Sequence, residues 1–166
     1  MALRTVVIEG DEILRKVCKP VKEVTPRIVE TLGDMLETMR DAYGVGLAAP
    51  QVGIMRRMFV AQPDPEDEDA VYYMINPEIL ELGENEVEGD EGCLSVPDVV
   101  GTVLRPDYIK IKALGIDGKE HVYEFHDFDA RVMQHEYDHL EGILFTDKAY
   151  DIHVPTAEDY EEDEEE

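Results

Sequence analysis

Two histidines four residues apart, with a glutamate directly after the first, are the side chains whose spacing most clearly suggests chemistry. They are His135, Glu136 and His139, in the stretch QHEYDHLEG at positions 134–142. On a helix such histidines lie about one turn apart, roughly 6 Å along the axis, so both imidazoles can share one metal ion. The glutamate is close enough to reach a water on that ion. This HExxH arrangement is typical of metal-dependent hydrolases.

The alternative is a solvent-facing helix on which histidine, glutamate and aspartate occur together by chance. A five-residue pattern does arise by accident in unrelated chains. Phe128 and Val132 favour the metal site, because they extend the face that carries the two histidines. Apolar residues at this spacing predict that the face is turned toward the core.

A catalytic metal site of this type needs a third protein ligand. Some HExxH proteases use a glutamate further along the chain, but the glutamates after His139 fall mainly in an acidic run near the end. Others use a histidine at the place that Phe145 occupies here. Cys93, in the stretch EGCLSVP at an expected strand start, is the remaining candidate. A thiolate with two imidazoles suits Fe²⁺, Zn²⁺, Co²⁺ or Ni²⁺.

An amphipathic helix is predicted well before these motifs, over the stretch VTPRIVETLGDMLETMRDAYG at positions 24–44. Thr25 can cap its start and Pro26 suits its first position. Gly44 is expected to end it in the left-handed conformation. One apolar stripe at helical spacing predicts the buried face: Ile28, Leu32, Met35, Leu36 and Met39.

Strands are predicted over residues 56–62 and 71–80, with the charged loop PDPEDEDA between them. Residues 107–125 predict a hairpin, because apolar and polar residues alternate on either side of Asp117 and Gly118, a pair favoured in tight turns. Since the strands mostly follow one another without intervening helices, the predicted class is α+β with antiparallel sheets.

The helix that carries the histidines is predicted from about Phe128 to Glu141. Asp127 or Asp129 can cap its start, and Gly142 can stop it. We therefore expect the two histidines to lie on a short, well-delimited helix inside the fold.

Length and charge set the organisation of the chain. With 166 residues, one domain is expected, and we predict a single catalytic domain over residues 1–152 and an acidic, disordered tail over residues 153–166. The net charge of −25 disfavours nucleic-acid binding.

The first residues resemble neither a secretory signal nor a transit peptide, so a cytoplasmic location is expected. Cys18 is expected to be a small buried side chain.

Three stretches together resemble the peptide deformylase family, whose motifs have the form GxGLAAxQ, EGCLS and QHExDHLxG. Here they read GVGLAAPQ at 44–51, EGCLS at 91–95 and QHEYDHLEG at 134–142, in the family's order. The resemblance covers about residues 3–150. It implies an α+β fold with antiparallel β-sheets around a central HExxH helix and another helix near the N-terminus.

The resemblance implies a metal-dependent hydrolase that removes the formyl group from the N-terminal N-formylmethionine of newly synthesised proteins and releases formate. By motif, the metal ligands would be Cys93, His135 and His139, with a water in the fourth position. The family's ion is usually Fe²⁺. A ferrous centre with a thiolate ligand is expected to be oxygen-sensitive, which makes Zn²⁺, Ni²⁺ or Co²⁺ the alternatives in purified protein.

The same motifs imply roles for the residues around the ion. Glu136 would be the general base, while the Gln51 side-chain amide and the Leu94 backbone N–H would stabilise the negative oxygen of the tetrahedral intermediate. Gly46 and Gly92 would let the substrate backbone approach from two sides, as an added strand. Three residues are candidates for the methionine pocket, with a place in the core as the alternative: Val45, Phe128 and Val132.

Departures from the family's pattern concern recognition beyond the methionine. An arginine often follows the CLSxP stretch, and Val100 takes its place here, while Arg105 matches a later arginine. Gln134 and Asp138 would orient the helix or the histidine rings. The acidic end replaces a helix that can dock on the ribosome. The expected partners are therefore formylmethionyl nascent peptides reached by diffusion, with transient ribosome proximity at most, for a monomer without direct nucleic-acid or membrane contact.

Two other functions fit parts of the sequence. The chain could be a metal-stabilised fold that binds formylated peptides without hydrolysing them, but a structural ion needs neither Glu136 nor Gln51. It could be an HExxH peptidase, but Phe145 and the missing glutamate ligand disfavour that reaction.

Overall fold

The computed structural model of the protein describes residues 2–155. Most of the predicted acidic tail, residues 156–166, lies outside the described residues. Strand β8 (Tyr150–His153) pairs with strand β5 (Val96–Pro106) and includes His153, the first residue of the predicted tail. The division into one domain and a tail stays a prediction. Among the described residues, no helix is both long and apolar enough to cross a membrane.

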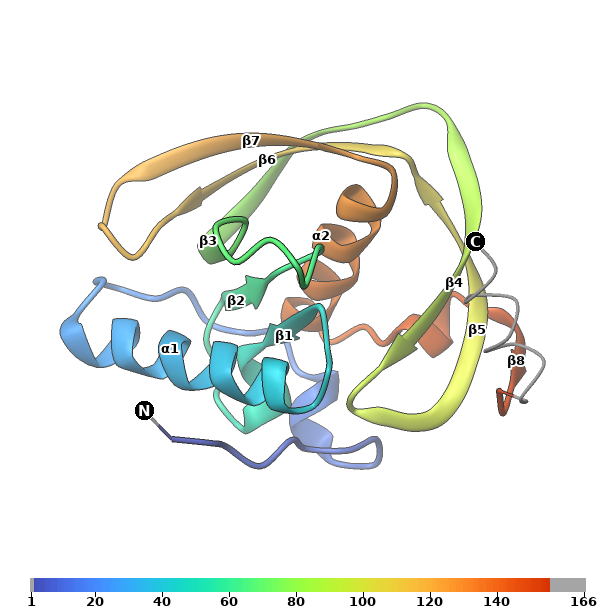
Figure 1. Ribbon diagram of the computed structural model, residues 1–166, viewed down its shortest axis with the longest axis horizontal. Helices are drawn as coiled ribbons and strands as arrows, with labels where there is room; N and C mark the ends of the chain where they lie inside the picture. The colour runs from blue at the N-terminus through green and yellow to red at the C-terminus, as the bar shows by residue number, and fades with distance from the viewer. Residues whose placement is uncertain (1, 156–166) are drawn as a thin grey trace.

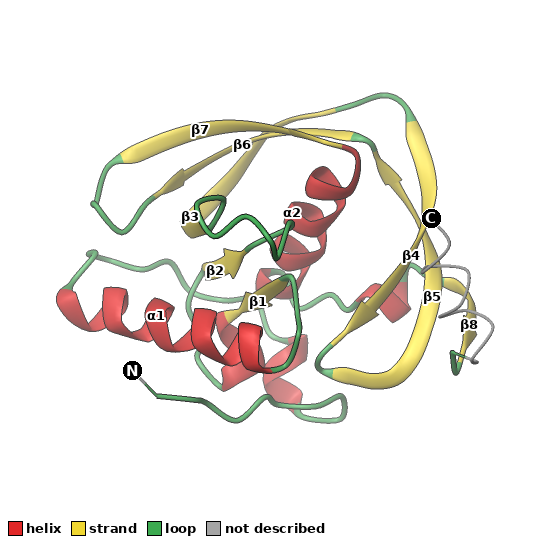
Figure 2. Cartoon of the chain, viewed as in Figure 1, coloured by secondary structure: helices red, strands yellow, loops and turns green. Residues whose placement is uncertain are grey.

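Two antiparallel sheets surround the helix α2 (Asp127–Leu140), as the sequence predicts (Figure 1). The larger sheet has the order β1-β2-β3-β6-β7 and the smaller one the order β4-β5-β8. In Figure 2, β6 and β7 arch over α2, while β4, β5 and β8 stand along another side of it. The other elements are η1 (Glu12–Arg15), α1 (Pro26–Asp41), β1 (Gly46–Ala48), η2 (Ala49–Val52), β2 (Met58–Ala61), β3 (Tyr72–Leu82), β4 (Glu86–Cys93), β5 (Val96–Pro106), β6 (Tyr108–Leu114), β7 (Glu120–His126) and η3 (Phe145–Asp147).

Strand β2 separates the two main hydrophobic clusters of the core. Its side chains alternate between faces, as they must in a strand. Met58 and Val60 pack in the cluster that contains the apolar stripe of α1, whereas Phe59 and Ala61 pack in the cluster that contains α2. All four are fully buried. Two helices with apolar faces are thus held on opposite sides of one strand, and this fixes where α2 presents its histidines.

The start of α1 is confirmed and its end is not. The Thr25 hydroxyl accepts a hydrogen bond from the Ile28 N–H (3.3 Å), with Pro26 at the first helical position. The left-handed residue after the helix is Tyr43 (φ 59°), one position earlier than the predicted Gly44. The Gly44 N–H closes the helix by donating to the Met39 carbonyl (2.9 Å). This geometry is the Schellman motif, here built on a tyrosine.

The β6–β7 hairpin is confirmed, with Gly118 at φ +75° in its turn. The sequence did not predict the other hairpin, β4–β5, and it placed Cys93 at a strand start. Cys93 is the last residue of β4 and faces Val96 across the turn. Strand β4 reads EVEGDEGC and is mostly exposed, so it lacks the apolar alternation that marks a half-buried strand.

Helix α2 begins at Asp127, one residue before the predicted start. Neither predicted aspartate caps it: the cap position is His126, without a side-chain bond to the backbone. Asp127 instead has φ 53°, and its N–H donates to the Asp107 carbonyl (2.8 Å). Gly142 ends the helix as predicted, at φ +75°.

Gly142 is also the point where α2 meets the N-terminal segment. A Cβ at this position would lie 2.6 Å from the Arg15 carbonyl oxygen, whereas a Cβ at Gly118, which has the same φ, would meet nothing within 4 Å. Gly118→Ala should therefore lower the free energy of unfolding by about 1 kcal/mol, the strain of a left-handed alanine. Gly142→Ala should add a clash with the Arg15 backbone and lower the free energy of unfolding by about 3 kcal/mol or more. Urea unfolding of both variants measures the difference; equal losses would contradict the close approach.

Candidate metal centre

The three predicted metal ligands come together in space. Cys93, His135 and His139 each offer one ligand atom, and these atoms all lie within 4.8 Å of one another. The Cys93 Sγ is 3.4 Å from the His139 Nε2, and the two imidazole rings are 5.0 Å apart between centroids. Because Cys93 ends β4 while both histidines lie on α2, the small sheet supplies the sulfur and the helix supplies the nitrogens.

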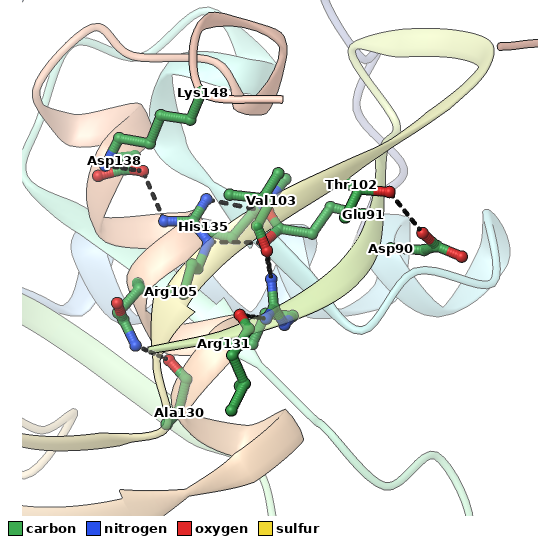
Figure 3. A network of polar contacts seen from close by, with 12 residues as sticks. Asp90, Glu91, Thr102, Val103, Arg105, Ala130, Arg131, His135, Asp138 and Lys148 are labelled. Atoms are coloured by element: carbon green, nitrogen blue, oxygen red, sulfur yellow. Dashed lines mark hydrogen bonds and ion pairs between the residues drawn. The ribbon is translucent and has the colours of Figure 1, made fainter. Parts of the chain in front are cut away.

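Glu91 holds His135 in place from the side away from the sulfur. Its Oε1 is 2.8 Å from the His135 Nδ1. Two arginines bind the same carboxylate: the Arg105 Nε donates to Oε2 (2.6 Å), and the Arg131 Nη1 donates to Oε2 (2.7 Å). Figure 3 shows this network between β4, β5 and α2. A carboxylate on Nδ1 keeps the proton there and leaves Nε2 free for a metal.

The charge on Glu91 follows from these contacts. Burial alone would favour the neutral acid, but the hydrogen bonds with His135 and Arg105 outweigh it and hold the pKa of Glu91 well below its ordinary value. For His135, burial would favour the neutral ring, but Cys93 and Glu91 outweigh burial and raise the pKa to about 10. The surroundings of His135 thus favour a positive charge between the Glu91 carboxylate and the Cys93 sulfur. A divalent metal ion bound there would supply such a charge.

His139 is buried, and burial together with the neighbouring charge of His135 holds its pKa well below the ordinary value. It is therefore a neutral imidazole, the form that binds metal. The donor set fits Fe²⁺, Zn²⁺, Co²⁺ or Ni²⁺. It consists of the soft sulfur of Cys93, the neutral ring of His139, and the ring of His135, whose surroundings favour a cation.

Glu136 lies in the same enclosure. Burial raises its pKa to about 7, although the charge of His135 counteracts part of the shift. Its Oε1 is buried and makes no hydrogen bond to any described residue. A Cβ on Gly46 would come within 2.6 Å of its Oε2. Gly46 therefore makes room for the glutamate itself, a role beyond the predicted approach of the substrate.

Gln51 is fixed beside the sulfur by three contacts. It lies in the short helix η2 and is buried. Its Oε1 accepts the Ala48 N–H (2.9 Å), which fixes the orientation of the amide. Its Nε2 donates to the Ser95 Oγ (3.1 Å) and lies 3.4 Å from the Cys93 Sγ. An N–H donor is thus presented at the centre, where the sequence predicted one.

A pocket of about 480 Å³ opens onto this centre. Val132 is buried, but Phe128 is 52% exposed, so the prediction that Phe128 belongs to an inward-facing apolar surface is wrong; it forms part of the pocket wall. The other predicted site residues in the lining are Val45, Gly46, Gln51, Gly92, Cys93, Leu94, His135 and Glu136.

Sequence reasoning missed the role of Glu91, although it is the first residue of the quoted EGCLS stretch. Gln134 and Asp138 were predicted to orient either the helix or the histidine rings, and among the described residues their hydrogen bonds go to other groups than the rings. The Gln134 Nε2 donates to the Pro106 carbonyl (2.9 Å), and the Arg105 Nη1 donates to Asp138 (2.9 Å). Val100 lies on β5 beside Gly92, 3.6 Å from where a Cβ on that glycine would stand.

Comparison with known proteins gives one consistent match. The family model described as polypeptide deformylase matches residues 3–154. A peptide deformylase from Agathobacter rectalis is 50% identical over 98% of this chain and 100% of its own length, and one from Lachnoclostridium phytofermentans is 46% identical over 99% and 100%. The crystal structure of peptide deformylase from Thermotoga maritima is 39% identical, with a TM-score of 0.86, covering 90% of this chain and 99% of that one.

The chain offers a matched test of the sulfur ligand, because both of its cysteines are free. Cys93→Ala should lose the metal, since two imidazoles alone bind an ion weakly. Cys18→Ala removes a buried thiol from the core and should lower stability while keeping the metal. Metal content per chain, measured by inductively coupled plasma mass spectrometry after anaerobic purification, separates the two. A stoichiometric ion in Cys93→Ala would remove Cys93 from the ligand set.

Glu91 and its neighbour Asp90 allow a second comparison. Glu91→Gln should weaken metal affinity about 10- to 100-fold, because a neutral amide replaces the charged carboxylate that orients His135, and its NH2 group cannot accept hydrogen bonds from Arg105 and Arg131. Asp90→Asn removes the same charge one residue away, where the carboxylate is exposed and binds only the Thr102 hydroxyl (3.2 Å). It should leave the affinity nearly unchanged in competition titrations with a chelator. Equal affinities for both variants would show that the contact with His135 is dispensable.

Proposed function

Because the chain belongs to the polypeptide deformylase family, we propose that its centre hydrolyses the formyl amide of N-terminal N-formylmethionine in newly synthesised proteins and releases formate. One observation supports this most: Cys93, His135 and His139 meet beside Glu136, a buried glutamate with an unpaired oxygen. A structural metal site would need the three donors and would have no use for that carboxyl group.

Cys93, His135 and His139 would hold one divalent ion, with Fe²⁺ as the physiological metal and Zn²⁺, Ni²⁺ or Co²⁺ as substitutes in purified protein. When bound, such an ion supplies a water with a pKa lowered toward neutrality and polarises a carbonyl group. The thiolate and the two imidazoles suit each of these metals.

Glu136 moves the protons. Its pKa of about 7 lets it accept a proton from the attacking water at neutral pH and return it to the departing amine. The carboxyl is held in the enclosure by close contact with Gly46, where no side chain competes for the space. Hydrolysis needs both transfers, since the amine leaves only as a protonated group.

Gln51 and Leu94 stabilise the charge that develops on the former carbonyl oxygen. The Gln51 Nε2 already points to the centre, and the Leu94 backbone N–H follows directly after Cys93. One such donor lowers the barrier by roughly 3 kcal/mol. The contacts of Gln51 with Ala48 and Ser95 fix its amide beside the centre, so this donor is positioned before the substrate arrives.

The substrate backbone would add to the free edge of β1, the terminal strand of the large sheet. Gly92 borders the pocket from the small sheet. The methionine side chain would occupy the apolar part of the pocket, against Val45, Phe128 and Val132. With Val100 in place of a charged residue, recognition rests mainly on the formylmethionine itself.

We further propose a monomer in the cytoplasm. All three metal donors come from one chain, so the centre needs no partner subunit. The substrates are polypeptides leaving cytoplasmic ribosomes.

Incubation with formyl-Met-Ala-Ser decides between the candidate functions. The proposed reaction releases formate and free Met-Ala-Ser with the peptide bonds intact. Cleavage of a peptide bond would indicate a peptidase. Binding without any release of formate would indicate a protein that only recognises formylated peptides.

Glu136→Gln tests the proton carrier. The amide cannot accept a proton, so kcat should fall at least about a hundredfold. Metal content should stay at one ion per chain, because Glu136 is not a ligand. Glu141→Gln, at the end of the same helix and paired with Arg57 (2.7 Å), serves as the control and should keep full activity. If Glu136→Gln turned over at the unaltered rate, another group would have to carry the proton.

A further inference from the structure

Positive charge is concentrated on one part of this acidic protein. Residues 15–27 and 56–57 hold seven of the chain's 15 lysines and arginines but only one of its 40 acids. The two segments lie together, because the Arg57 N–H donates to the Lys19 carbonyl (2.8 Å) and Lys19 forms an isolated bridge with Arg56. Cations that are distant in the sequence therefore share one surface.

The backbone of this segment turns its lysines toward solvent. Lys16, Lys19 and Lys22 are exposed, whereas Cys18 and Val21 between them are buried. A three-residue alternation of this kind places the lysines on the same side of an extended chain. At about 3.1 Å per residue, the three charges span up to roughly 19 Å.

Five of the seven cations on this surface make no ion pair with a described carboxylate. Two residues at its border are paired, Arg15 with Asp147 and Arg57 with Glu141. Within residues 2–155, five cations between these pairs make no ion pair, and we call them the basic strip: Lys16, Lys19, Lys22, Arg27 and Arg56.

The net charge of −25 predicts no contact with nucleic acid, and that prediction describes the chain as a whole, whereas the basic strip is a local concentration of positive charge. At 0.1 M salt, charges are screened beyond about 10 Å, so remote carboxylates act weakly on a partner that touches the strip. Their repulsion still slows the approach of a polyanion. The expected binding is therefore weak, local and strongly dependent on salt.

The chemistry of the strip fits phosphates better than a protein or lipid surface. Ammonium groups bind phosphate oxygens as point charges. Val17 is the one exposed large apolar residue within residues 15–27. A protein interface would need an apolar centre, and a membrane surface would need an amphipathic apolar face.

We propose that the basic strip binds the phosphate backbone of structured RNA. The choice of RNA rests on the proposed function, since formylmethionyl chains emerge from ribosomes, whose surface is rich in RNA. The Cys18 N–H donates to the Leu140 carbonyl (2.9 Å), so the strip lies at the C-terminal end of α2. The pocket is lined by the other half of α2, from Phe128 to Glu136, and none of the strip residues is in its lining.

A matched pair of variants tests this surface. The strip variant is Lys16→Gln, Lys19→Gln and Lys22→Gln. The control removes the same charge from the β6–β7 hairpin: Lys110→Gln, Lys112→Gln and Lys119→Gln. Binding of the full chain to purified ribosomes and to ribosomal RNA is measured from low to physiological salt. The strip variant should bind at least about tenfold more weakly at low salt, with the log–log salt slope reduced by about two, and the control should stay within about twofold.

Hydrolysis of free formyl-Met-Ala-Ser separates this proposal from the proposed function. Both variants should keep the unaltered kcat/KM, because none of the lysines lies in the site; inactivity of the unaltered chain would overturn the deformylase function alone. Equal weakening in both variants, or binding that does not depend on salt, would overturn the RNA surface. Stronger binding to anionic lipid vesicles or to poly-glutamate than to RNA would overturn it too.

Discussion

A single buried carboxylate, that of Glu91, links the parts of this protein that must meet for the centre to exist. It binds His135 on α2, Arg105 on β5 and Arg131 on α2, and it lies on β4 two residues before Cys93. A buried charge is costly unless it is fully paired, and removing one partner leaves the others uncompensated. The network therefore couples the small sheet to the helix. The same contact that secures the fold also sets which nitrogen of His135 is free.

The rest of the centre depends on close approach between elements. Gly46 on β1 leaves space that the Glu136 carboxyl fills, and Gly142 lets the end of α2 touch the backbone of Arg15. Both approaches need a residue without a side chain. The large sheet thus supplies the edge and the space for the base, the small sheet supplies the sulfur, and α2 lies between them as the common wall.

Local patterns predicted part of this structure and long-range contacts account for the rest. The apolar stripe of α1 and the Asp117-Gly118 turn were readable because the signals lie within a few residues. Strand β4 could not be predicted in this way, because it is mostly exposed and is held by its pairing with β5. Tyr43 takes the left-handed position that glycine usually occupies, so the end of α1 was misplaced by one residue. The partners of Glu91 are 14, 40 and 44 residues away, and no local pattern marks such a network.

X-ray absorption spectroscopy at the edge of the bound metal tests the central claim most directly. For anaerobically purified protein, the account predicts one sulfur ligand at about 2.3 Å and two imidazole nitrogens at about 2.0–2.1 Å, with a light-atom ligand from solvent. A first shell of nitrogen and oxygen without sulfur would contradict it, because the tip of the small sheet would then take no part in the centre.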